Sequence, residues 1–281
     1  MRATDAVTAA GERLSGSAAT CREVVRRTRR ARVTFLAAAV AYFFAVSLVP
    51  LAVMLVVVAS LVGGTDIALV VIRHATRLLG PEADGLLYDV LTDQASGAKV
   101  TAVGLPVLLW GALRTFRSLD TAFEEVYRDE SRDSLAESLV DAAVVLGATS
   151  LGAALMVGVG FFLDPVSTVG NVLEPVALFV ALAVVFYPMF YLFPDADPDP
   201  RTVLPGTLFT AACWTGFQML FQTVAIPIGR ATVAGTFGVV LLTLTWLYVG
   251  SLLLLVGASI NAVVGERAAV AVAERRPRGY A

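Results

Sequence analysis

The chain has 281 residues, of which 57% are hydrophobic and 16% are charged. Soluble domains average about 45–50% apolar and about 25% charged residues, so this composition is typical of a membrane protein and excludes a disordered chain. A single histidine, His74, and two separated cysteines, Cys21 and Cys213, exclude a His/Cys metal cluster and a Cys-x-x-Cys redox site. We therefore expect no metal and no cofactor. The net charge is only −2, and Lys99 is the only lysine among the basic residues.

Uncharged stretches of the sequence predict the membrane spans. A spanning helix needs about 20 apolar residues, and all the uncharged stretches but one reach that length unaided. The exception, residues 100–113, must continue past Arg114 and Arg117 to cross the membrane. We predict an all-α polytopic membrane protein, a six-transmembrane-helix bundle with spans at about residues 33–62, 100–119, 142–163, 175–193, 202–229 and 231–265. A basic N-terminal segment, residues 1–32, and a tail, residues 266–281, flank this transmembrane domain, residues 33–265.

The arginines predict the orientation of the bundle. With the N-terminus inside, the cytoplasmic segments carry seventeen basic residues and the external segments carry four. Cytoplasmic loops of membrane proteins are enriched in Lys and Arg, so both termini of this multi-pass protein are expected to be cytoplasmic.

A basic cluster, Arg22–Arg32, lies directly before the first span. Each basic residue beside an anionic leaflet contributes about 1 kcal/mol to membrane attraction, so we expect this cluster to contact membrane lipids through their anionic headgroups. The alternative, binding of nucleic acid, is disfavoured because no aromatic side chain for base stacking is interleaved with the arginines.

The only long external segment, residues 66–99, has its own helical pattern. Apolar residues recur at helical spacing in two stretches, Ile67, Val70, Val71, Ala75 and Leu78, then Leu86, Leu87, Val90 and Leu91. We predict two short amphipathic helices that pack against the bundle or the membrane interface, with a gate as the alternative.

Prolines interrupt the predicted spans. Each removes a backbone donor and bends or ends a helix, so we predict a bundle of kinked helices. The prolines concerned are Pro50, Pro106, Pro188, Pro205 and Pro227.

Four charged residues at the end of the second span are the main candidates for a functional site: Arg114, Arg117, Asp120 and Glu124. Ionisable groups at membrane depth are costly unless they are paired or face a wet cavity. One interpretation is a charged wall at the inner mouth of a substrate pathway. The other is a cytoplasmic helix end whose arginines reach up to the lipid headgroups.

Three amides complete the candidate substrate pathway: Gln218, Gln222 and Asn261. Gln218 and Gln222 are four residues apart and are predicted to share one helix face. Amides on such a face also hydrogen-bond neighbouring helices, so a purely structural role is the alternative.

Several motifs of the sequence, taken in chain order, resemble those of the YihY/BrkB family of six-span inner-membrane proteins, once labelled ribonuclease BN. The matching residues are Ala37–Tyr42, Ser47–Leu51, Phe116, Leu119, Ala122, Val126, Tyr127, Leu204-Pro205-Gly206, Trp214, Phe221, Gly235–Gly238, Thr245–Tyr248 and Gly257–Ala262. The resemblance covers roughly residues 25–265. Glu124 stands where the family pattern has Asn, and Ser259 stands where it has Glu.

The resemblance implies a six-span plasma-membrane protein. A transporter or flippase for a lipid or another amphipath is our first hypothesis, and a non-transporting scaffold that maintains the envelope is the alternative. A membrane-bound ribonuclease is the least supported, because RNA hydrolysis needs clustered acid/base groups or a metal and the cytoplasmic acids are scattered. No Walker-type phosphate-binding loop occurs, so any ATPase would be a partner protein. Homo-oligomerisation stays open.

Overall fold

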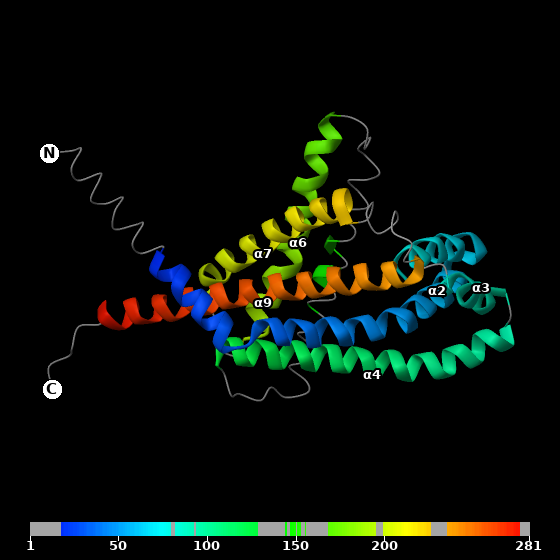
Figure 1. Cartoon of the computed structure of the whole chain (residues 1–281), viewed down its shortest axis with the longest axis horizontal. Coiled ribbons are helices and arrows are strands. Elements are labelled where there is room, and N and C mark those ends of the chain that lie inside the picture. The colour runs from blue at the N-terminus through cyan, green and yellow to red at the C-terminus, as the bar shows by residue number, and fades with distance from the viewer. Residues whose placement is uncertain are drawn as a thin grey trace. The chain divides into compact units, whose positions relative to one another are not determined.

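The computed structural model describes residues 18–79, 82–92, 94–128, 144, 147–149, 151–152, 155, 168–194, 199–225 and 235–275. Every element within these ranges is helical, as predicted (Figure 1). A helix at residues 18–30 is followed by α2 (Val33–Leu79), α3 (Glu82–Thr92), α4 (Gln94–Tyr127), α6 (Thr168–Leu192), α7 (Pro200–Leu220), the π-helical turn η1 (Phe221–Ala225) and α9 (Gly235–Arg275).

Three described helices are long and apolar enough to cross a membrane. They are Val33–Thr76, Leu173–Leu192 and Gly238–Val270, which correspond to the predicted first, fourth and sixth spans. The predicted second and fifth spans are helical in α4 and α7 but contain charged or hydroxyl side chains that make them less apolar. The predicted span 142–163 lies largely outside the described residues. The count of six therefore stays a prediction.

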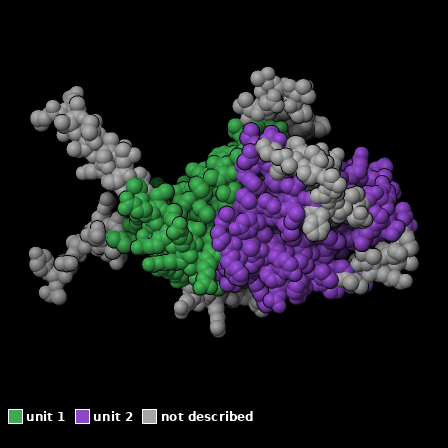
Figure 2. Space-filling model, in the orientation of Figure 1, with its two compact units in different colours: residues 1–33, 122–216, 253–281 green, residues 34–121, 217–252 purple. Residues whose placement is uncertain are grey.

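The chain divides into two compact units (Figure 2). The first contains residues 1–33, 122–216 and 253–281, and the second contains residues 34–121 and 217–252. The boundaries between the units fall inside α2, α4, α7 and α9 or at their ends, so they do not test the predicted division into N-terminal segment, transmembrane domain and tail. Residues 266–275 of the predicted tail continue α9 as helix.

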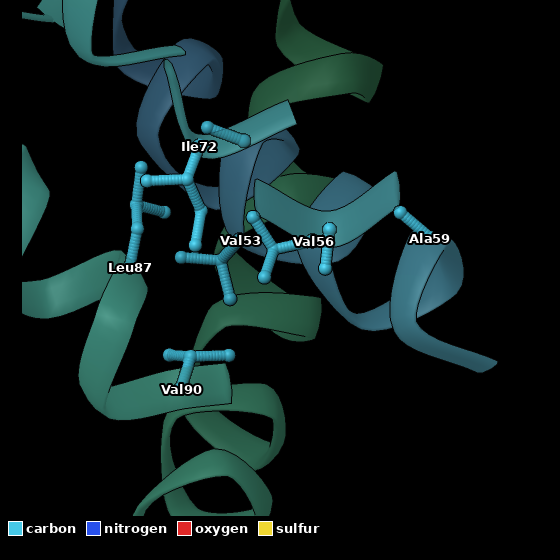
Figure 3. Close-up of a cluster of buried hydrophobic side chains, with 8 residues drawn as sticks. Val53, Val56, Ala59, Ile72, Leu87 and Val90 are labelled. Carbon is cyan, nitrogen blue, oxygen red and sulfur yellow. The ribbon is translucent and has the colours of Figure 1, made fainter. Parts of the chain in front are cut away.

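The segment that follows the predicted first span forms helices that pack on this span, as predicted. Helix α2 leaves helical geometry at Gly64, where φ is 67° and ψ is −165°, a conformation that suits glycine. Beyond Gly64, the second part of α2 and then α3 return against the first part. Figure 3 shows Val53 and Val56 from the first part facing Ile72 and Leu87, and all four side chains are buried.

The buried side of the helix beyond Gly64 matches the predicted apolar side only in part. Ala68 and Ile72 are fully buried, whereas Ile67 is 50% exposed and Val70 is 42% exposed. Val71 and Ala75 from the predicted side are partly buried against the same cluster. Helix α4 also begins earlier than the predicted loop boundary at residue 99, because it starts at Gln94.

The prolines do not end the helices that contain them. Pro50, Pro106, Pro188 and Pro205 lie inside α2, α4, α6 and α7, and the non-helical residue within α2 is Gly64 instead. Pro227 lies outside the described residues. Bending at the prolines therefore stays a prediction.

The core of the first unit is built around Phe123, which is 1% exposed, near the end of α4. Its ring stacks parallel to Tyr127 and contacts Phe190 and Phe193, with centroid distances of 6.2, 6.0 and 5.1 Å. Aromatic pairs at these separations add about 0.5–1.5 kcal/mol beyond the burial of their area. The aromatic cluster fixes the C-terminal turn of α4 against α6.

Candidate functional site

Helix α4 carries an exposed face that changes from apolar to cationic along its length. Leu109 and Leu113 are 56% and 60% exposed, and Arg114 and Arg117 follow them, also exposed. The Arg114 guanidinium carbon lies 5.7 Å from the centroid of the Trp110 ring, within the range of a cation–π contact.

The other side of α4 packs closely on α2 in the second unit. The rings of Trp110 and Phe43 meet edge to face with centroids 6.3 Å apart. A Cβ atom placed on Gly111 would lie 3.0 Å from the Cβ atom of Ser47, so a larger residue has little room there. Trp110 is thus held by α2 while its ring supports Arg114.

The four charged residues of the predicted site lie in different surroundings. Arg114 and Arg117 are exposed in the second unit, and Asp120, which also belongs to that unit, is half-buried. Glu124 is exposed and belongs to the first unit. Asp120 and Glu124 each take part in further interactions. Joint action of the four residues therefore stays a prediction.

The two predicted glutamines have different environments. Gln218, near the end of α7, accepts a hydrogen bond of 2.8 Å from the Trp246 indole Nε1 of α9. Gln222 lies in the π-helical turn η1 and is exposed. Gln218 joins two helices, in line with its structural interpretation, and Gln222 does not take part in that contact.

Asn261 is 3% exposed and joins α9 to α7. Its Oδ1 accepts a hydrogen bond of 2.6 Å from the backbone N–H of Gly206. At this level the two helix backbones are in close contact, because a Cβ atom on Gly206 would overlap the carbonyl oxygen of Gly257. A Cβ atom on Gly257 would in turn overlap the Thr210 hydroxyl. Sequence reasoning singled out Asn261 but missed this glycine seam, for which the separate Gly206 and Gly257 motifs were the only signal.

Two buried polar atoms lie near this seam, one of them on Asn261 itself. The Nδ2 of Asn261 and the hydroxyl of Tyr127 have no hydrogen-bond partner among the described residues. Burial raises the pKa of the Tyr127 phenol, and the Arg27 guanidinium and the Asn261 amide each lower it in part. Tyr127 therefore belongs with Asn261, although the sequence identified it only as part of a motif.

Arg27 differs from its neighbours in the basic cluster because it is buried, with 5% of its surface exposed. Headgroup contact by the cluster stays a prediction. The Nε of Arg27 donates to the Val126 carbonyl at 2.7 Å, and its Nη2 pairs with Glu266 Oε1 at 2.6 Å. A guanidinium is favoured at the end of α4, where carbonyl groups lack helical partners and the helix dipole is negative.

The remaining arginines of the N-terminal helix face outwards. Arg22, Arg29 and Arg30 are exposed. Arg26 pairs with Glu23 one turn earlier, and its guanidinium holds the pKa of the Glu23 carboxyl below its usual value. Farther along the chain, Arg267 donates to the Thr20 hydroxyl, which gives the N-terminal helix a second contact with α9.

Comparison with known proteins places the chain among bacterial membrane proteins. A UPF0761 membrane protein of Methylibium petroleiphilum is 27% identical over 93% of this chain and 66% of its own length. A UPF0761 membrane protein of Neisseria meningitidis serogroup B is 26% identical over 84% of this chain and 60% of its own length. The ribonuclease-like protein YfkH of Bacillus subtilis is 24% identical over 82% of this chain and 89% of its own length.

The chain thus spans less than two thirds of the length of these UPF0761 relatives. No solved structure matches it. The sequence profile of the family described as Virulence factor BrkB matches residues 24–279, which is most of the chain and agrees with the resemblance seen in its motifs. The protein is therefore an integral membrane protein of the Virulence factor BrkB family.

Proposed function

We propose that the protein is a transporter or flippase that moves a lipid or another amphipath across the plasma membrane. The observation that carries this proposal is the exposed face of α4, where Leu109 and Leu113 are followed by Arg114 and Arg117. An amphipath has the same division into an apolar part and a charged part. The face matches such a molecule better than it matches a small ion or a soluble metabolite.

The proposal includes the six-span topology with both termini in the cytoplasm. The three long apolar helices support it, as does the concentration of arginines in the segments assigned to the inside. In this orientation Arg114, Arg117 and the exposed arginines Arg22 and Arg29 all lie at the inner leaflet. The latter two are then placed to contact anionic headgroups.

Labelling of introduced cysteines tests this topology. In a background lacking Cys21 and Cys213, an impermeant thiol reagent is expected to modify Asp89→Cys in intact cells and to spare Asp197→Cys. Asp89 is exposed on α3, so its access depends on the side of the membrane and not on burial. If the reagent modified Asp197→Cys and spared Asp89→Cys, the proposed orientation would be contradicted.

Reconstitution tests transport directly. Purified protein in vesicles is expected to accelerate the movement of fluorescent phospholipid between leaflets. The double variant Arg114→Gln with Arg117→Gln is expected to move the phospholipid more slowly than the unchanged protein. Each lost headgroup contact corresponds to about 1 kcal/mol, or about fivefold. Arg73→Gln is the matched control, because Arg73 is an exposed arginine on the external part of α2.

Other outcomes of this experiment select the alternatives. Folded protein that moves no lipid or solute would instead favour a scaffold that binds lipids or partner proteins. RNA cleavage that persists through purification and is lost in Asp120→Asn would favour a nuclease, the activity suggested by the name of the Bacillus relative.

A further inference from the structure

We infer that a phospholipid with an anionic headgroup binds the exposed face of α4, with its phosphate at Arg114 and Arg117. This inference deepens the proposed function by naming the class of amphipath, and its binding test stands apart from the test of transport.

The charge of this stretch of α4 has a single sign. Arg114 and Arg117 are the only ionisable side chains in residues 100–119, and both are exposed. Three residues on a helix advance the chain by about 4.5 Å, which brings two guanidiniums within reach of one phosphate group. The face therefore attracts an anion and repels a cationic amphipath.

Trp110 prepares Arg114 for this contact. The guanidinium lies over the indole ring at 5.7 Å, and the ring is in turn packed against Phe43. A guanidinium held over an aromatic ring still presents N–H groups, and these match the oxygen atoms of a phosphate. Holding the side chain in place reduces the entropy lost when a headgroup binds.

The order of side chains along α4 matches the order of groups in a phospholipid. Leu105, Leu109 and Leu113 are 41%, 56% and 60% exposed and offer a surface for an acyl chain. Trp110 is 47% exposed beside them, and tryptophan concentrates at the boundary between hydrocarbon and headgroups. The two arginines come next, so the headgroup points towards the C-terminal end of α4.

Fluorescence quenching by brominated lipids tests the inference on the full chain. Trp214→Phe with Trp246→Phe leaves Trp110 as the single tryptophan, and bromine atoms quench it only at short range. Brominated phosphatidylglycerol is expected to quench Trp110 at lower mole fraction than brominated phosphatidylcholine, by about fivefold for each guanidinium. Arg114→Gln with Arg117→Gln should remove the preference.

Two further measurements keep the result clear. Arg73→Gln with Arg201→Gln removes the same charge from exposed positions elsewhere and should leave the preference intact. Native mass spectrometry of the chain with all three tryptophans should show retained phosphatidylglycerol, which guards against damage from the Trp246 substitution.

Equal quenching by the two lipids, or a preference that survives loss of both arginines, would overturn the lipid site. Phospholipid movement in the reconstituted vesicles is measured separately. Phospholipid movement without a lipid preference at Trp110 would overturn the lipid site alone. A lipid preference without phospholipid movement would overturn the transport function alone.

Discussion

Arg27→Gln is expected to lower the thermal unfolding temperature of the purified protein strongly. Arg27 is 5% exposed and donates to both the Val126 carbonyl and Glu266. Hydrogen bonds that involve a charged group contribute about 1.5–3 kcal/mol each, and a shortened side chain makes neither of them well. We expect a loss of about 2–3 kcal/mol, because the exposed Glu266 regains water when its partner is removed.

Two variants show whether the effect comes from the buried pair. Arg29→Gln removes an exposed charge from the same helix and should change stability by less than about 0.5 kcal/mol. Glu266→Gln leaves the Arg27 charge buried with only the Val126 carbonyl, so it should also destabilise, and adding Arg27→Gln should relieve part of that loss. Equal unfolding temperatures for Arg27→Gln and Arg29→Gln would contradict the assigned role of Arg27.

Gly206→Ala is expected to prevent the close approach of α7 and α9. The added Cβ atom would overlap the backbone carbonyl of Gly257 and lie 2.5 Å from Asn261 Cγ. Backbone atoms cannot rotate aside, so the helices must separate, and the bond from Gly206 to Asn261 is lost with them. Overpacking of this kind costs about 1–3 kcal/mol, to which the lost hydrogen bond adds about 1 kcal/mol.

The same helices supply matched controls for this prediction. Nothing lies within 4 Å of a Cβ atom on Gly216 in α7 or on Gly265 in α9. Alanine at either position should be neutral or stabilising by up to about 1 kcal/mol, because alanine is the better helix former. If Gly206→Ala gave the same folded yield and unfolding temperature as Gly216→Ala, the close contact of α7 and α9 at Gly206 would be contradicted.

Gly257→Ala distinguishes overlap with a side chain from overlap with the backbone. Its Cβ atom would overlap the Thr210 hydroxyl and lie 3.0 Å from the Gly206 carbonyl oxygen. Thr210→Ala removes the hydroxyl and should partly restore Gly257→Ala, but it should not restore Gly206→Ala, whose conflict is with backbone.

The sequence by itself determined the helical class, the family and the positions of the long apolar helices. The family follows from the order of the motifs. The helical class and the apolar helices follow from composition and from runs of apolar residues, because a backbone in hydrocarbon must satisfy its own hydrogen bonds within a helix. The sequence also predicted helices within residues 66–99, and α2 beyond Gly64 and α3 confirm this. Each of these properties is local to a stretch of chain.

Only the tertiary structure decided which side chains of those helices are buried and paired. Arg27 looks like its neighbours in the basic cluster, yet its partners Val126 and Glu266 are 99 and 239 residues away in the sequence. The burial of Ala68 in place of Ile67, and the contact of Gly206 with Gly257, likewise depend on helices that lie far along the chain or across a turn. A residue is buried only if another part of the chain covers it. The periodicity of one helix does not specify which other helix packs on it, or on which of its faces.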